Sequence, residues 1–425
     1  MYTVLFYFLN MKENIIGFFL NSNSTDKTII YFYKNNNYYY LGQGLGAMRK
    51  SDTLKRAVGR ARKSHNGAPP VPKSWEEMTV PPNLSTTVRG GQFLALDEFS
   101  TPGSAEKIII FCSQDQKDVM RTAQYWVADG TFDVVSRTMF TQLFIIISMS
   151  QTGITVPTLF ALLPSKECSS YQRVFQYLLD EGINPPGSLK TDFERAIIRG
   201  FLNVFPGSTV NGCDTHFKRA LRRKLSSTEF GLGGLYANSR EFQTLVRHIW
   251  ALSLVPPDAI VPTWEGYIQD RFTELKPEFE DYAEAVEEWL GYVERTYIGA
   301  LNWRTGNRKA PMFPHSLWNK YNSVLEDEAL TSNSAEGFNA ALAMSLPRNC
   351  SIWTLIKQLQ AEENTNIRKV MDVALGAQNN AATNPSTSRN LARAHRRQDL
   401  KRLVGNYHSV SLKVYMTSLI DFFNY

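Results

Sequence analysis

The sequence predicts an α/β fold in which a mixed sheet, an antiparallel meander plus parallel strands, carries helices on both faces and is interrupted by an all-helical insertion. Three observations predict this fold. Three apolar runs, at 123–135, 138–150 and 154–164, follow one another with only short turns between them, which is typical of a meander. Short strands and helices then alternate. Residues 226–332 show helical periodicity without a convincing strand.

The start of the chain is basic and has no clear core of its own. Residues 1–45 form a poorly defined N-terminal segment, in which the alternation at 28–33 is compatible with one strand. Residues 46–120 form an N-terminal basic and helical region with a linker. Positive charges from 48 to 64 predict a helix, which the prolines of 65–74 would end because proline cannot continue it.

The first part of the core covers residues 121–225. Apolar residues recur every two residues in its strands and every 3.6 residues in its helices, and this difference separates the two kinds of element. Together with the elements just before it, the predicted order around the meander is a strand at 108–112, a helix capped by Ser113 and running to about Gln124, a helix at 169–182, a strand at 188–192, a helix at 193–205, a strand at 208–213 and a basic helix at 216–225.

Residues 226–332 are predicted to be an all-helical insertion, on the basis of two apolar stripes. The stripes comprise Phe242, Leu245, Val246, Ile249 and Leu252, and then Phe279, Tyr282, Val286, Trp289, Leu290 and Val293. Residues 333–376 then close the core with two helices, of which the first is capped by Asn333 or Ser334 and ends near Ser345. Residues 377–425 are predicted to be a linker and a basic tail.

From the meander onward, the order is three strands, a helix, a strand, a helix and a strand, then the interruption and a helix. This is the layout of a ribonuclease-H-like fold, in which acids on the first strand, the fourth strand and the last helix converge. The three positions hold Asp129, Asp192 and Glu336. An acid inside a buried strand is costly unless it is paired or bound to a cation. Two divalent cations held about 3.5–4 Å apart by carboxylates can activate the attacking oxygen and stabilise the leaving oxygen in phosphodiester transfer. The set therefore predicts a site for Mg²⁺ or Mn²⁺, with two ions.

A purely local role for each acid is the alternative. Asp192 could cap the helix that follows, Glu336 could favour a first helical turn, and Asp129 could be a turn acid. Glu336 is preferred as the third acid because Ala340 and Ala343, on its own helical face, would allow a close approach to the sheet. Five further acids lie near the three positions, namely Asp133, Glu194, Glu326, Asp327 and Glu328.

Several motifs together resemble a known family. The stretches ADGTF, FTQLF, PTLFALLPSK, KTDFERA, GCDTHFKRALRRK and TSNSAEGF are similar to the Mutator-like (MULE) transposase domain of eukaryotic DNA transposons, over roughly residues 70–375. The resemblance implies that Asp129, Asp192 and Glu336 are the metal-binding catalytic triad. The sequence departs from the family in having Ser332-Asn333 ahead of the glutamate, where relatives often have two asparagines. No cysteine precedes Cys112, whereas many relatives carry an N-terminal FLYWCH-type finger.

Two secondary signals lie between the second and third acids. Cys213 and His216 form half a zinc site at best, and we expect a structural pair or a contact to DNA beside the active site instead. Such a pair is also common in the family. The next helix places Lys218, Arg219, Arg222 and Arg223 on one side. These cations could follow DNA phosphates or form a solvated helix face, and their place beside the triad favours DNA. The basic tail could be a nuclear-import signal, a DNA contact or solvated charge.

The resemblance implies a DNA transposase of the nucleus that cleaves and joins double-stranded DNA at transposon terminal repeats and in target DNA, as a homo-oligomer. The rival interpretation is a domesticated or decayed, non-catalytic DNA-binding descendant. A net charge of +6 permits an anionic partner without requiring one. Four cysteines without a C-x-x-C pair argue against a disulfide framework. We expect a soluble protein with no signal peptide and no membrane partner, since no apolar run reaches about 18 residues.

Overall fold

The structure is a computed structural model, and it describes residues 9–11, 14–16, 70–99, 106–132, 134–135, 139–150, 153–328, 333–347, 350–376 and 388–423. The chain divides into two units, Met1–Pro70 and Val71–Tyr425. In the first unit, β1 (Leu9–Met11) pairs antiparallel with β2 (Asn14–Ile16). The strand predicted at 28–33 and the basic helix predicted at 48–64 lie outside the described residues.

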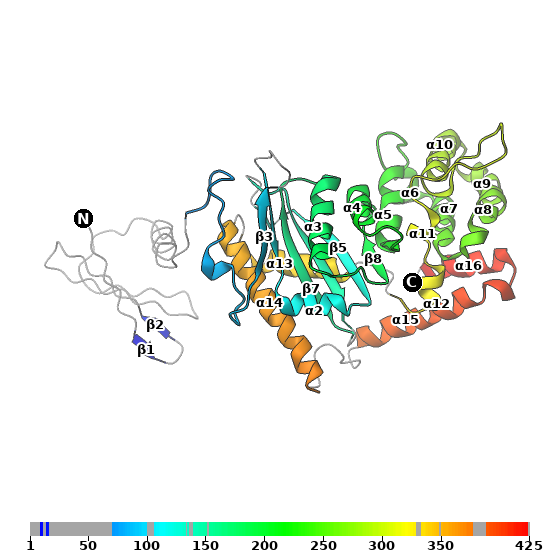
Figure 1. Ribbon diagram of the computed structural model, residues 1–425. Coiled ribbons are helices and arrows are strands. Elements are labelled where there is room, and N and C mark those ends of the chain that lie inside the picture. Colours follow the sequence, from blue (N-terminus) through cyan, green and yellow to red (C-terminus); the bar gives the residue numbers. More distant parts are fainter. Residues whose placement is uncertain are drawn as a thin grey trace, which may run out of the picture. The chain divides into compact units, whose positions relative to one another are not determined.

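The second unit is mixed α/β and is built on a seven-stranded mixed sheet with the order β3-β4-β7-β6-β5-β8-β9 (Figure 1). Strands β5, β6 and β7 pair antiparallel, so the predicted meander is confirmed. Strands β8 and β9 extend the sheet in parallel beyond β5. The strands are β3 (Leu94–Phe99), β4 (Lys107–Phe111), β5 (Tyr125–Thr131), β6 (Gln142–Met149), β7 (Thr155–Leu163), β8 (Ser188–Thr191) and β9 (Val210–Gly212).

Strand β3 is a difference from the expected order. It pairs antiparallel with β4 at the edge of the sheet, and it was not predicted from the sequence. Most of its residues are half-buried, because the strand lies at the edge of the sheet. It therefore has no long apolar run, and this weak apolar signal is why the sequence did not predict the strand.

Side chains of successive strand residues point to opposite faces of the sheet, and each face has its own core. On one face, Trp126, Ala128 and Phe144 pack against α3 (Cys168–Asp180) and α4 (Arg195–Val204). On the other face, Val127 and Ile145 pack against α13 (Asn333–Ser345) and α14 (Ile352–Ala374). Helices therefore cover both faces of the sheet.

A buried ion pair fixes the segment that precedes β3. The guanidinium of Arg89 lies 2.6 Å from the Glu363 carboxylate on α14 and 2.8 Å from Asp115 on α2 (Gln114–Arg121). The Ser113 hydroxyl donates to the same Glu363 oxygen at 2.8 Å, and Ser113 also caps α2 in a capping box, as predicted. Glu363 is fully buried, so these donors compensate a carboxylate that would otherwise be costly to bury.

Described residues between α5 (Asp214–Leu225) and Glu328 are helical apart from loops and one isolated bridge between Leu301 and Arg308. Tyr282 is 46% exposed and precedes α10, so it does not belong to the predicted second stripe. The elements are α6 (Gly233–Asn238), α7 (Arg240–Ala251), η2 (Leu252–Leu254), η3 (Pro257–Ala259), α8 (Ile260–Thr263), η4 (Trp264–Ile268), α9 (Gln269–Leu275), η5 (Lys276–Tyr282), α10 (Ala283–Val293), η6 (Glu294–Ile298), α11 (His315–Trp318) and α12 (Tyr321–Leu325).

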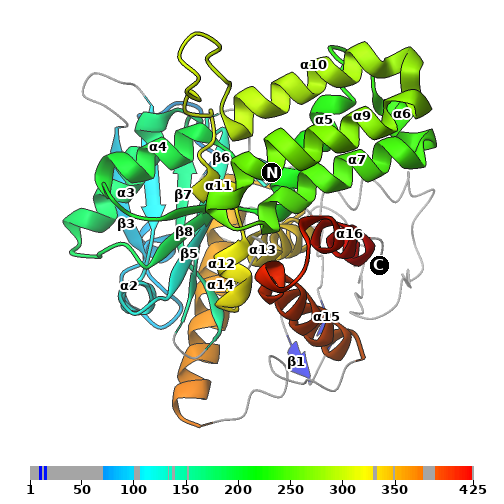
Figure 2. The same ribbon diagram turned by 90° about the vertical axis from the view of Figure 1, so that its right-hand side faces the viewer.

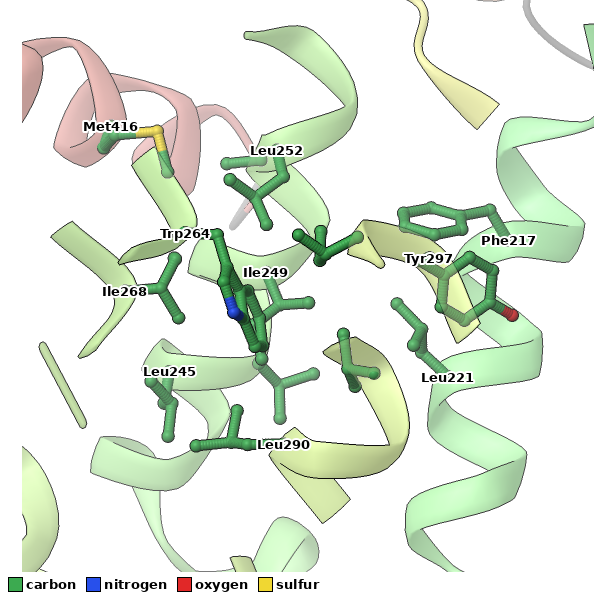
Figure 3. Packing of buried hydrophobic residues seen from close by; sticks show 14 of the residues in the cluster. Phe217, Leu221, Leu245, Ile249, Leu252, Trp264, Ile268, Leu290, Tyr297 and Met416 are labelled. Atoms are coloured by element: carbon green, nitrogen blue, oxygen red, sulfur yellow. The ribbon is translucent and has the colours of Figure 1, made fainter. Parts of the chain in front are cut away.

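These helices enclose an apolar core of their own. Trp264 is almost fully buried and lies among Ile249, Ile268 and Leu290 (Figure 3). The end of the chain adds to this core, because α15 (Ser388–Gly405), η7 (Tyr407–Ser409) and α16 (Leu412–Phe423) follow one another and bury residues such as Met416 in it. Figure 2 shows α16 lying beside α7. These terminal helices were not predicted from the sequence.

No helix in the described parts of the chain combines the length and the apolar character that a membrane span requires.

Candidate active site

The first acid, Asp129, lies near the end of the central strand β5. It shares the alternation of Val127 and therefore faces α13. Its carboxylate accepts two hydrogen bonds, from the Gly130 backbone at 2.8 Å and from the Asn339 side chain on α13 at 2.7 Å. These bonds fix the orientation of the carboxylate in a half-buried position.

The second acid, Asp192, follows directly after β8. Strands β5 and β8 are parallel, and their register pairs Ala128 with Thr191. The next residue on each strand is an aspartate, so Asp129 and Asp192 are brought to adjacent places on the same side of the sheet. The sequence predicted this convergence from the layout of the elements and from the family resemblance.

His216 connects the second acid to the third. It lies in the first turn of α5, which begins after the buried Cys213. Its Nδ1 is 2.8 Å from Asp192 Oδ1, and its Nε2 is 3.3 Å from Glu336 Oε1. The contact with Asp192 is short but not aligned as a hydrogen bond. His216 thus touches both carboxylates, a closer involvement than the near-site pair predicted from the sequence.

The third acid, Glu336, lies in the first turn of α13 and also lies 3.6 Å from the Arg219 guanidinium. The sequence-based reason for preferring it was wrong, because Ala340 and Ala343 are both exposed. The helix instead packs on the sheet through Ala335 and Leu342.

Burial and the charges of the site shift two pKa values. Burial, followed by repulsion from Asp192, raises the pKa of Asp129 to about 7, and Glu336 adds to this repulsion. The Asp192 carboxylate raises the pKa of His216 to about 10, and Cys213 adds to it, while partial burial acts in the opposite direction. The imidazole is therefore protonated at neutral pH and places a positive charge between two acids.

Gly130 allows a polar side chain to approach β5 closely. A Cβ atom at this position would lie 2.4 Å from Gln142 Oε1, so another residue would clash. The Gln142 amide donates to the Tyr171 hydroxyl at 2.7 Å, and that hydroxyl donates to Glu194 at 2.7 Å. Gly130, the glycine of the ADGTF motif, thus leaves room for the Gln142 side chain against β5.

The other acids near the three positions have different partners or are not described. Glu194 accepts the Tyr171 hydrogen bond, Asp327 pairs with Lys401, and Glu328 lies 3.5 Å from Lys190. Glu326 is exposed, and Asp133 lies outside the described residues.

The donor chemistry of the cluster suits a hard cation. Asp129, Asp192 and Glu336 offer carboxylate oxygens, which Mg²⁺ and Mn²⁺ prefer. Burial, and then the charge of Asp192, raises the pKa of Asp129, and a cation would offset both effects. As arranged, His216 lies between two of the acids. Among the described residues, no group of three or more His, Cys, Asp or Glu side chains is positioned to hold a metal ion. The three acids therefore suit Mg²⁺ or Mn²⁺ by the type of their ligand atoms. In the present arrangement, His216 contacts Asp192 and Glu336.

Three of the four candidate DNA-binding side chains are exposed. Arg219, Arg222 and Arg223 lie on the outer side of α5. Lys218 is more engaged, because its ammonium lies 2.7 Å from Asp214 and 4.2 Å from the centre of the Phe423 ring. Its charge is therefore partly balanced within the chain.

Asn339 is a site residue that sequence reasoning missed. It lies three residues after Glu336 on the same helix, so both side chains point to the same side. This spacing was available in the sequence, but an asparagine in a helix carries no specific signal until its hydrogen bond to Asp129 is known.

The protein is mixed α/β, and its acidic site lies where the parallel strands β5 and β8 meet the helices α5 and α13. Residues 125–220 match the family model of the MULE transposase domain, in agreement with the resemblance found in the sequence. The match covers less than a quarter of the chain; it includes Asp129, Asp192 and His216, and Glu336 lies outside it. A comparison with curated proteins found no match.

Proposed function

We propose that the chain is a DNA transposase that cleaves and joins phosphodiester bonds at transposon ends with a triad of Asp129, Asp192 and Glu336. One observation carries the proposal. His216 contacts Asp192 and Glu336, and Asp129 lies on the strand beside Asp192. Residues 125–220 of the same chain match the MULE transposase domain. In this proposal the sheet is ribonuclease-H-like and the helices after α5 form an insertion.

Each side chain of the site has a defined task in the proposal. Asp129, Asp192 and Glu336 would hold two Mg²⁺ or Mn²⁺ ions through their carboxylate oxygens. When bound, such ions activate the attacking oxygen and stabilise the leaving one. Asn339 orients Asp129 through its amide. Water would be the nucleophile for cleavage, and a freed 3′-hydroxyl would be the nucleophile for joining.

The proposed partners follow from the proposed reaction. They are the terminal repeats of a transposon and a target, both double-stranded DNA, bound by a homo-oligomer in the nucleus. The exposed arginines of α5 lie beside the site, with Arg219 3.6 Å from Glu336. Cations in that place would bind phosphates close to the bond that is cut.

The second candidate is a non-catalytic DNA-binding protein derived from a transposase. It is favoured by the position of His216, whose ring lies between Asp192 and Glu336 and compensates their charge without a metal. Terminal inverted repeats in the genomic DNA around the gene would favour the active enzyme. Their absence would favour the non-catalytic descendant.

Replacement of Asp192 by Asn tests the proposed chemistry. The substrate is a plasmid that carries the terminal repeats, incubated with the full chain in Mg²⁺ or Mn²⁺. We expect Asp192→Asn to fold normally and to lose cleavage, because a neutral amide cannot bridge two cations. Asp118→Asn is the matched control, since Asp118 is exposed and its carboxylate pairs with Arg121 at 2.6 Å on the surface of α2. Cleavage by Asp192→Asn at the rate of the control would remove the triad assignment.

A further inference from the structure

A polar cavity lies in the helical part of the chain, away from the acidic site. Its volume is about 630 Å³, and α7, η4, α9 and α16 form its walls. Four cationic side chains line it, namely Arg240, Arg247, Arg271 and Lys413. Asp421 is the single carboxylate among the described residues that line it. The cavity therefore carries a clear excess of positive charge.

Most of this charge is not balanced by a carboxylate in the described part of the chain. Arg271 pairs with Glu274 on its own helix. Among the described residues, no carboxylate lies within ion-pair distance of Arg240, Arg247 or Lys413. Cations that share one cavity repel each other, and an anion placed between them would remove that cost.

Several other side chains of the wall are uncharged and polar. His248 is 2% exposed, and burial together with the charge of Arg271 lowers its pKa to about 3, so the imidazole is uncharged at neutral pH. Its Nδ1 lies 3.3 Å from the Tyr267 hydroxyl. Thr244 and Thr417 also line the cavity, and their hydroxyls donate to the backbone carbonyls of Arg240 and Lys413 at 2.8 Å. An oxygen-rich anion would meet mainly the charged donors here.

A series of interactions joins the cavity to the basic helix α5. The Arg222 guanidinium lies 5.3 Å from the centre of the Tyr236 ring. The Tyr236 carbonyl accepts a hydrogen bond of 2.8 Å from Gln243, whose own oxygen accepts one of 3.4 Å from Arg247. Arg222 of α5 is therefore linked to Arg247 of the cavity through Tyr236 and Gln243.

We infer that this cavity is a phosphate-binding site, and that its ligand is a backbone phosphate of DNA that runs on from α5. Guanidinium groups match phosphate oxygens in geometry and charge. The volume suits a phosphate with its attached sugar, within the range of roughly 300–1,000 Å³ typical of ligand pockets. The DNA assignment rests on the proposed function. The phosphate chemistry rests on the cavity alone.

The test uses the full chain and two probes, inorganic phosphate and a duplex DNA of arbitrary sequence. The variant Arg240→Gln/Arg247→Gln removes two cavity cations on α7, of which Arg240 is exposed and Arg247 is half-buried. The matched control, Arg304→Gln/Lys309→Gln, removes two exposed cations from the loop after η6. Calorimetry measures phosphate affinity, and fluorescence anisotropy measures DNA affinity at several salt concentrations. Circular dichroism checks folding, and Lys413→Gln, at an exposed position, is a second cavity variant if the first is unfolded.

We expect the cavity variant to lose at least about tenfold in phosphate affinity while the control is unchanged. For DNA, the slope of log affinity against log salt should fall by about 0.9 for each phosphate that the variant no longer neutralises. Loss of phosphate binding with an unchanged DNA slope would overturn the DNA assignment and leave a free phosphate compound as the ligand. Equal phosphate affinity in all three proteins would overturn the site itself. Failure of the cleavage assay would leave the phosphate result standing.

Discussion

His216 is the residue whose state controls the acidic site when no cation is bound. Its ring lies between Asp192 and Glu336, and the first of these carboxylates is the main cause of its raised pKa. A neutral ring would leave Asp129, Asp192 and Glu336 to repel each other without compensation. The protonated imidazole therefore stabilises an arrangement of acids that would otherwise weaken the fold.

This position predicts a pH dependence of stability. The folded-state pKa of His216, about 10, lies above the unfolded value of about 6.5. Its stabilisation is therefore fully present below pH 6.5 and is lost as the pH rises through 10. Asp129 adds a separate decline, because its carboxylate is destabilised as the pH rises from about 4 to about 7. The measurement above pH 7 thus isolates His216.

We expect His216→Gln to be less stable than the wild type by a few kcal/mol at pH 7, since one pKa unit corresponds to about 1.4 kcal/mol. The difference should shrink toward about pH 9.5, close to the folded-state pKa. Urea denaturation in the presence of EDTA, repeated across this range, measures it. A constant difference between the two proteins at every pH would show that the ring contributes packing and no charge.

At the scale of the element, α5 separates its two faces clearly. Phe217, Leu221 and Leu225 recur every four residues and are buried in the helical core, while the arginines lie on the opposite side. The same helix brings His216 to the acids at its start. It therefore joins the sheet, the helical part and the proposed DNA surface.

If this outer face binds DNA, the triple variant Arg219→Ala/Arg222→Ala/Arg223→Ala should weaken binding to any sequence. The salt slope should fall by about 0.9 for each phosphate that is no longer neutralised. Lys218→Ala should have a smaller effect, because its ammonium is already paired with Asp214. A variant with Arg121, Lys357 and Arg368 changed to Ala is the charge-matched control from exposed positions on α2 and α14. Equal salt slopes in the triple variant and this control would place the DNA path elsewhere.

Elements with strong local patterns could be predicted from the sequence. The apolar runs of β5, β6 and β7 and the Ser113 cap of α2 are confirmed. The terminal helices were missed, since α15 is polar over most of its length and buries its few apolar residues against the distant helical core. That core, assembled from residues of both segments, has no signature within either one.

For the whole molecule, the predicted layout and the family resemblance together indicated that Asp129 and Asp192 converge. The structure adds the reason, because β5 and β8 are parallel neighbours and their register pairs Ala128 with Thr191. The interactions of His216 and Asn339 could not be predicted in this way. They depend on the angle at which α5 and α13 reach the sheet. The Arg89–Glu363 pair likewise joins positions that no sequence period relates.

The central claim is that Asp129, Asp192 and Glu336 form one cation site, and binding of Mn²⁺ to the full chain tests it most directly. Electron paramagnetic resonance measures free Mn²⁺ in a titration at neutral pH. We expect binding by the wild type and by Asp118→Asn, with loss of at least about tenfold in affinity for Asp129→Asn and for Glu336→Gln, because each removes a charged oxygen ligand. Equal Mn²⁺ affinity in all four proteins would contradict the claim.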